Sequence, residues 1–244
     1  MAIREFLKNN AKKILSRLGI YITRNQKYDH LTLQILKKEL HPASHVVDIG
    51  CHKGEFLEDV LRLAPKGRHM AFEPLPDLAK ILRRKFHAAP VVVWDVALAA
   101  ENGISDFVIV PEAPAYSGLR ERTYPSGVRH LEKIQVQVRR LDDVLPPDYC
   151  PHLIKIDVEG AEWEVLKGAE NILRRCHPVL LFEFGRGASD QYGVGPEILF
   201  PWLQEKGYSL YTLNGYLLKN RPLSASDFEQ LYFSGTEYYF VARA

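Results

Sequence analysis

Short apolar runs alternate with helical patterns through the first half of the chain, and this alternation constrains the fold more than any other feature. "HVVDIG" precedes a helical pattern over residues 55–63, and "HMAFEP" precedes another over residues 78–86, before the strand "VVVWDVAL". Strands that alternate with helices are joined by right-handed crossovers and form a parallel sheet with helices on both faces. The sequence therefore predicts a Rossmann-like, doubly wound α/β domain.

The pattern changes between Asn102 and Leu145 and then resumes. "SDFVIV" and "IQVQVRRL" alternate with a period of two residues, as antiparallel strands do, and residues 111–133 between them form a long loop without helical period. The alternation returns with "HLIKIDVEG", a helix over "AEWEVLKGAENILRRC" and the strand "PVLLFEF", and "YSLYTL" and "EYYFVARA" indicate a closing hairpin. We expect a helical segment over residues 1–40 and one domain over residues 41–244.

The composition fits a folded protein and excludes some classes of function. The 244 residues are 46% hydrophobic and 25% charged, and 32 basic against 30 acidic residues leave a net charge of +2. A general nucleic-acid binder would carry a large basic excess, so no nucleic-acid partner is expected. Cys51, Cys150 and Cys176 lie far apart without zinc-ligand spacing, which predicts reduced thiols in a cytoplasmic protein.

Residues 1–18 predict a basic amphipathic helix. Apolar residues at helical spacing alternate with five bases and one acid, and no apolar run is long enough for a bilayer span or a signal peptide. Two interpretations stay open: the helix contacts an anionic membrane surface, which would make the protein membrane-peripheral, or it caps the domain or forms a homo-oligomer contact. A second helix is expected over residues 31–40, where His41 and Pro42 end it.

The stretch "VVDIGCHKGEF" predicts a strand that runs into a glycine turn with an acid at its root. The dinucleotide fingerprint G-x-G-x-x-G needs a middle glycine beside the pyrophosphate, but Cys51 and His52 follow Gly50 here, before Gly54. Asp48 would also repel a pyrophosphate. The turn therefore favours a cationic ligand without phosphate, and S-adenosylmethionine fits, with an amino-acid tail, an adenosine and a positive sulfonium.

Two further acids follow at the ends of the next strands. Glu73, in "AFEP", follows Gly50 at close to the ~20-residue spacing at which an acid holds ribose hydroxyls, and Asp95 is placed to accept from the adenine amino group. Ligands of open α/β sheets bind at the carboxyl ends of the strands, where these features meet. The predicted cofactor residues are Asp48, Gly50, Cys51, His52, Gly54, Phe56, Glu73, Pro74, Asp95, Val96, Ala97 and Asp157.

With these motifs the chain resembles the FkbM-type family of class I S-adenosylmethionine-dependent methyltransferases. The resemblance rests on "VVDIGCHKGEF", "AFEP", "VALAAENG" and above all "LIKIDVEGAEWEVLKGAENIL" followed by "HPVLLFEF", and it covers about residues 46–184. It implies a seven-stranded sheet with an antiparallel last strand, and methylation of oxygen, often a hydroxyl of a sugar or natural product. The chain departs from the family turn at Cys51 and His52, where alanine and asparagine are usual.

Carboxylates at the ends of the fourth and fifth strands are the candidate catalytic groups. A hydroxyl acceptor needs a general base, or a metal that lowers its pKa, while the acceptor attacks in line. Asp157 and Glu159 lie on one side of the strand if it stays extended, and Glu183 ends its neighbour. A divalent cation is possible there but is not predicted. In the alternative reading Glu159 caps the next helix, Asp157 lines the cofactor pocket and Glu183 holds a loop through Arg186.

Two loops beyond the strand ends are expected to bind the acceptor, a small molecule, sugar or glycan. Aromatic faces and forked guanidinium donors suit a sugar ring or an anionic sugar, although a solvated loop explains the same residues. The candidates are Tyr116, Ser117, Arg120, Arg122, Tyr124, Arg186 and Tyr192. Two other functions stay open: a non-catalytic glycan- or protein-binding module on this scaffold, and, less favoured because the middle glycine is missing, an NAD-dependent oxidoreductase.

Overall fold

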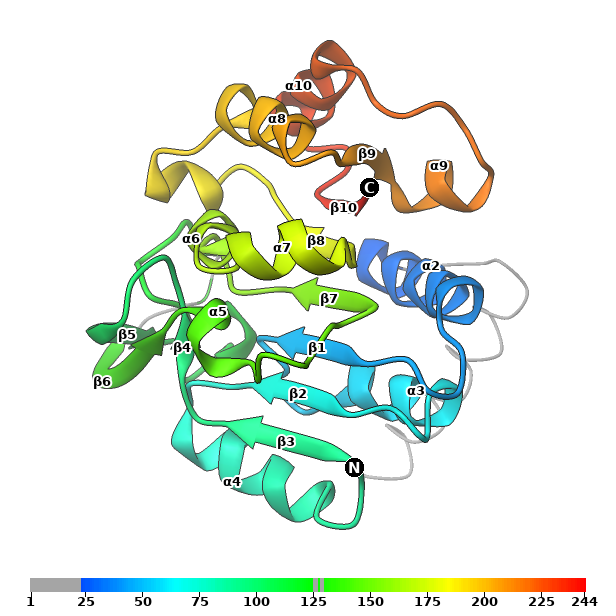
Figure 1. Ribbon diagram of the computed structural model, residues 1–244. Coiled ribbons are helices and arrows are strands. Elements are labelled where there is room, and N and C mark those ends of the chain that lie inside the picture. Colours follow the sequence, from blue (N-terminus) through cyan, green and yellow to red (C-terminus); the bar gives the residue numbers. More distant parts are fainter. Residues whose placement is uncertain (1–22, 125–126, 128–129) are drawn as a thin grey trace.

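The computed structural model describes residues 23–124, 127 and 130–244, and a seven-stranded sheet forms its centre (Figure 1). The strands lie in the order β3-β2-β1-β7-β8-β10-β9. β10, the last strand in the chain, runs antiparallel to both of its neighbours, so the expected sheet with an antiparallel last strand is confirmed. Its strands are β1 (Val46–Ile49), β2 (His69–Phe72), β3 (Val91–Trp94), β7 (Leu153–Ile156), β8 (Val179–Glu183), β9 (Ser209–Thr212) and β10 (Tyr239–Arg243).

Helices cover both faces of this sheet, as a doubly wound fold requires. Every residue of β1, β2 and β7 is buried, because parallel strands in such a sheet have no solvent face. One face packs against α2 (Arg24–Glu39), α3 (Glu55–Leu63), α4 (Pro76–Lys85) and α9 (Leu213–Leu217). The other packs against α5 (Leu141–Val144), α6 (Glu162–Lys167), α7 (Glu170–Cys176), α8 (Pro196–Glu205) and α10 (Ala225–Ser234).

The helix boundaries follow local chemistry that periodicity alone does not contain. α3 covers the predicted residues, but α2 begins earlier than expected because Thr23 and Gln26 form a capping box at its start. The single helix predicted after β7 is instead two helices, α6 and α7. The chain breaks at Gly168, where a Cβ would collide with the carbonyl oxygen of Ala99. The expected hairpin connection between β9 and β10 contains α9 and α10.

A second, three-stranded sheet lies beyond the carboxyl ends of β1, β2 and β3 (Figure 1). It contains β4 (Ala97–Leu98), β5 (Gly103–Ile109) and β6 (Glu132–Arg139), and β5 and β6 pair antiparallel as predicted. "VVVWDVAL" was expected to be one strand, and this is wrong. β3 ends at Trp94, and Ala97 pairs with Val138 of β6 because the buried residues after Asp95 pack into the small sheet.

The N-terminal helix predicted over residues 1–18 lies outside the described residues. Among the residues that are described, no helix combines the length and the apolar character needed to cross a membrane. α2 packs into the main core, where Ile35 and Leu36 are fully buried beside Val46 and Leu153.

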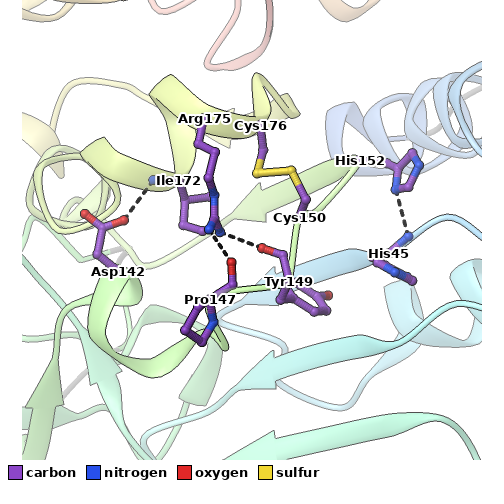
Figure 2. Close-up of a disulfide and its surroundings, with 9 residues drawn as sticks. All are labelled: His45, Asp142, Pro147, Tyr149, Cys150, His152, Ile172, Arg175 and Cys176. Carbon is purple, nitrogen blue, oxygen red and sulfur yellow. Dashed lines mark hydrogen bonds between the residues drawn. A yellow bond between two sulfur atoms is a disulfide. The ribbon is translucent and has the colours of Figure 1, made fainter.

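Cys150 and Cys176 form a disulfide (Figure 2), so the prediction of reduced thiols is wrong for this pair. Cys150 lies just before β7 and Cys176 ends α7, and the β7–α6–α7 segment returns the chain to the amino end of the sheet. The sequence separation of 26 residues hides this proximity. Arg175 reinforces the junction by donating to the carbonyl oxygens of Pro147 and Tyr149. Cys51 is free and buried.

We expect the disulfide to stabilise the fold measurably. It closes a loop that contains β7, and loops of this length stabilise by about 3 to 4 kcal/mol through the lost entropy of the unfolded chain. Reduction with dithiothreitol, or Cys150→Ser with Cys176→Ser, should lower the melting temperature by roughly 10 °C. The double variant itself should not respond to reductant. An unchanged melting temperature after reduction, with the released thiols titrated, would contradict the expectation.

Candidate active site

The turn after β1 approaches the backbone after β7 so closely that no side chain fits between them. Gly50 has a φ of +75°, and a Cβ there would collide with the carbonyl oxygen of Asp157. The Gly50 N–H donates to the carbonyl oxygen of Phe72 in β2 at 3.0 Å, and the Asp157 N–H donates to the carbonyl oxygen of Ile49 at 3.0 Å. Gly54, also at positive φ, begins α3 against Phe86. Gly50 thus brings the ends of β1, β2 and β7 together, and Gly54 lets the start of α3 pack against the end of α4.

Asp48 is fully buried and does not open onto this turn. It pairs in register with Lys155 of β7, and the Lys155 Nζ lies 3.3 Å from Asp48 Oδ1 and 3.2 Å from Asp157 Oδ2. Burial lowers the pKa of Lys155, but Asp157 and Asp48 outweigh it and hold the pKa well above its ordinary value. The carboxylate of this group that reaches the surface is therefore Asp157, whose side chain is 31% exposed.

Glu73 joins the glycine turn to the end of β2. Its carboxylate accepts from the His52 N–H at 2.8 Å and from the Leu75 N–H at 3.1 Å. Burial raises the pKa of Glu73 to about 7, against the lowering effect of these two hydrogen bonds. The backbone of His52 makes the contact, so the unusual residue at this position of the turn does not disturb it. Cys51 is buried beneath the turn, and burial raises the pKa of its thiol.

Asp95 lies just after β3, and its carboxylate already has a partner within the protein. It is exposed and forms an ion pair with Arg83 of α4, with 2.6 Å between Oδ1 and Nη2, and this hydrogen bond lowers its pKa. Val96 and Ala97 beside it are buried. The Glu73 N–H donates to the Trp94 carbonyl at 3.0 Å, so the ends of β2 and β3 are adjacent as predicted. Contact of Asp95 with adenine stays a prediction. Contact of the half-buried residues Phe56 and Pro74 with the cofactor also stays a prediction.

The three predicted catalytic carboxylates do converge, though not through an extended strand. Asp157, Glu159 and Glu183 each offer a carboxylate oxygen within 4.8 Å of the others. β7 ends at Ile156, and Glu159 has a φ of +57°, so a tight turn rather than strand alternation brings Glu159 back. Burial, followed by the charge of Asp157, raises the pKa of Glu183 to about 8.

Glu162, which the sequence reading did not select, holds this carboxylate turn in place. Its Oε1 accepts from the Val158 N–H at 3.1 Å and from the Gly160 N–H at 3.2 Å, the two residues that flank Glu159. Gly160, with a φ of +111°, has no room for a side chain against Ala188. Glu162 thus holds the turn before α6, while no side chain forms a cap hydrogen bond at the start of that helix. Burial raises the pKa of Glu162 to about 7.

The two loops that were predicted to bind the acceptor contact each other. The Thr123 N–H donates to the Gly187 carbonyl at 3.0 Å, and Arg120 donates to the Gln191 carbonyl at 3.1 Å. Arg122 forms an ion pair with Glu159 and lies 5.3 Å from the centre of the Tyr116 ring.

The remaining predicted acceptor residues divide by burial. Arg120 lies 4.7 Å from the centre of the Tyr192 ring, and Tyr192 is half-buried with its hydroxyl unpaired in the described structure. Tyr124 is also half-buried, with an unpaired hydroxyl there. Arg186 is exposed. Ser117 is buried, and its hydroxyl accepts from the Val110 N–H at 3.0 Å, which is a structural contact at the end of β5.

Residues from α2 and from the segment just before β10 also approach the site, although the sequence did not predict them. Desolvation, followed by the charges of Glu55 and Asp157, raises the pKa of Asp29, so these three acids lie near one another. Tyr238, just before β10, donates from its hydroxyl to Asn25 at 2.6 Å and is close enough to Glu183 for that carboxylate to help raise its pKa, after burial. No local sequence pattern marks these residues, because distant segments bring them here.

Comparison with known proteins agrees with this architecture. The sequence model of the Methyltransferase FkbM domain matches residues 48–210, more than half of the chain. Methyltransferase sdnD of Sordaria araneosa is 30% identical over 155 residues, 51% of this chain and 60% of that protein. 2-O-methyltransferase NoeI of Sinorhizobium fredii is 28% identical over 174 residues, which cover 63% of this chain and 67% of that protein. Hexuronic acid methyltransferase AglP of Haloferax volcanii is 25% identical over 162 residues, which cover 66% of this chain and 65% of that protein.

The fold is thus a Rossmann-like α/β fold, and the chain belongs to the Methyltransferase FkbM domain family. The resemblance seen in the motifs is confirmed. The family match begins at Asp48 and includes the glycine turn, Glu73 and the three converging carboxylates. The aligned regions span about 60% of the sdnD protein and about two thirds of NoeI and AglP.

Glu162→Gln should make stability less sensitive to pH. Folding raises the pKa of Glu162 from 4.5 to about 7, so between these values the folded state binds a proton that the unfolded state has lost. The contribution of Glu162 to stability is therefore full at pH 4 and declines as pH rises to 7. Glutamine keeps the acceptor oxygen and does not titrate. The fall in melting temperature between pH 5 and pH 8 should be smaller in the variant, and an equal fall would refute the assignment.

Proposed function

We propose that the protein is an S-adenosylmethionine-dependent O-methyltransferase that acts on a hydroxyl of a sugar, glycan or natural product. The observation that carries this proposal is the convergence of the glycine turn, Glu73 and the Asp157–Glu159–Glu183 cluster at the carboxyl ends of β1, β2, β7 and β8. A site bordered by carboxylates favours a cationic ligand over a pyrophosphate. Family membership supports methyl transfer over the nicotinamide alternative.

Residues of this chain fit each part of the cofactor. The close-packed turn at Gly50 lets a backbone approach the amino-acid tail, and Asp157 offers a carboxylate to its ammonium group. Each Glu73 oxygen accepts one backbone N–H and keeps a lone pair for a ribose hydroxyl. Asp95 and Val96 follow β3, on the adenine side. When bound, the cofactor would supply an activated methyl group, and the protein's part is to orient the acceptor and exclude water.

Glu183 is the best-suited proton acceptor among the three carboxylates. Glu159 is paired with Arg122 and Asp157 with Lys155, whereas Glu183 has a pKa of about 8 and so takes up a proton near neutral pH. A base whose pKa lies near the working pH is the most effective at removing a proton from a hydroxyl.

A sugar or an anionic sugar is the acceptor class that we favour. NoeI is named a 2-O-methyltransferase and AglP a hexuronic acid methyltransferase, which supports a hydroxyl and a sugar as acceptor. Arg122, which pairs with Glu159, lies over the Tyr116 ring, and Arg120 lies over the Tyr192 ring of the other loop. An aromatic face stacks on the apolar face of a sugar, and a guanidinium binds a carboxylate.

Calorimetry with S-adenosylmethionine and S-adenosylhomocysteine tests the cofactor assignment, with NAD as the negative control. Both should bind, and their affinity should rise as pH increases from 6 to 8, because ribose hydroxyls donate to the ionised Glu73, whose pKa is about 7. Glu73→Gln should weaken binding and remove this pH dependence. Absence of binding by both ligands at every pH would end the proposal. A screen of sugars and glycans for products that gain one methyl group then identifies the acceptor, and binding without turnover would favour the non-catalytic alternative.

If Glu183 is the base, kcat/KM should rise with pH through about 8, because the group is protonated below its pKa and only the ionised form accepts a proton. Asp157 and Glu162 support this high pKa by charge, while Arg122 and Lys155 oppose it. Glu183→Gln should lower kcat by roughly 100-fold or more and leave the affinity for S-adenosylhomocysteine largely unchanged. An unchanged pH profile in a variant that retains activity would exclude Glu183 as the base.

A further inference from the structure

A buried lysine lies beside the glycine turn of the candidate cofactor site and has no role in the proposed chemistry so far. Lys155 stands opposite Asp48 in the β1–β7 register, so the two side chains share one face of the sheet. Its ammonium contacts three acceptors: Asp157 Oδ2 at 3.2 Å, Asp48 Oδ1 at 3.3 Å and the Gly50 carbonyl at 3.5 Å. An ammonium has three N–H donors, so this set occupies all of them.

The triad Asp48–Lys155–Asp157 runs from the core to the surface. The exposed fraction of the side chain rises from 0% at Asp48 to 11% at Lys155 and 31% at Asp157. The Phe56 ring, 5.7 Å from the Lys155 Nζ, and buried Tyr239 lie beside the ammonium. Two carboxylates and one ammonium leave the triad with one net negative charge, and its solvent-accessible end is the Asp157 carboxylate.

Lys155 therefore cannot act by touching a ligand, since it is nearly buried and its donors are occupied. Lys155 can instead fix the position of the Asp157 carboxylate. By bonding Asp157 and the Gly50 carbonyl together, it ties the carboxylate to the turn that is expected to receive the amino-acid tail of the cofactor. Asp48, whose Oδ2 has no hydrogen-bond partner in the described structure, anchors the ammonium from below.

We propose that Lys155 is a positioning residue for the cofactor, which holds the Asp157 carboxylate against the glycine turn so that it receives the ammonium group of the amino-acid tail. This inference rests on the proposed function and adds a division of labour to it. Asp157 makes the contact, Lys155 orients Asp157, and Asp48 serves as the buried counterion that allows a lysine at this depth.

The test is the double variant Asp48→Asn with Lys155→Met, which removes one negative and one positive charge. The triad keeps its net charge of one negative unit at Asp157, so a change in binding reports position and not charge. Calorimetry uses S-adenosylmethionine, S-adenosylhomocysteine and 5′-methylthioadenosine, which lacks the amino-acid tail. The first two should each bind roughly tenfold or more weakly, the loss of one charged hydrogen bond, and the third should bind as it does to the wild type.

The third ligand also reports whether the double variant is folded. Asp157→Asn is the second variant, because it leaves the Lys155–Asp48 pair intact and should show the same selective loss for the two ligands with a tail. Either variant binding S-adenosylmethionine as tightly as the wild type would overturn the proposal. If the wild type binds none of the three ligands, the proposed function itself has failed, which is a different outcome from wild-type binding that the variants retain.

Discussion

The site depends on one backbone contact, the close approach of the turn after β1 to the turn after β7. At Gly50 there is no space for a Cβ, because the Asp157 carbonyl occupies it, and the Asp157 N–H continues the hydrogen bonds of β1 through Ile49. This contact brings the glycine turn and the carboxylate turn around Glu159 into one site, and the hydrogen bond from the His52 N–H joins Glu73 to it. Any side chain at Gly50 would separate the two turns and disperse these groups.

The second property of the site is that several carboxylates lie close together and are largely removed from solvent. Burial raises the pKa of Glu73 and Glu162 to about 7 and that of Glu183 to about 8. Such clusters cost stability unless each carboxylate has a partner, and the structure supplies backbone N–H groups for Glu73 and Glu162. Within the described part of the chain, no backbone N–H donates to the Glu183 carboxylate, and raised pKa values of this kind are characteristic of functional sites.

Local pattern predicted much of this architecture, and its failures have physical causes. The alternation of strands and helices predicted the parallel sheet, and the order of Gly50, Glu73 and Asp157 predicted the edge where they meet. Glu162 was missed because its role depends on the turn at Glu159, which the period of a strand does not contain. The disulfide was missed because its cysteines are separated by a helical crossover that returns the chain to the same end of the sheet.

The sequence by itself determined the fold class, the glycine turn and the family, because these depend on the period of apolar residues and on residues adjacent in the chain. Only the tertiary structure decided which acid is exposed at the site. Asp48 stood out in the sequence, yet it is fully buried against Lys155, and Asp157 is the exposed end of the triad. The reason is register: β1 and β7 lie side by side, so Asp48 and Lys155 neutralise each other across the sheet, and Asp157, two residues further along, reaches the surface.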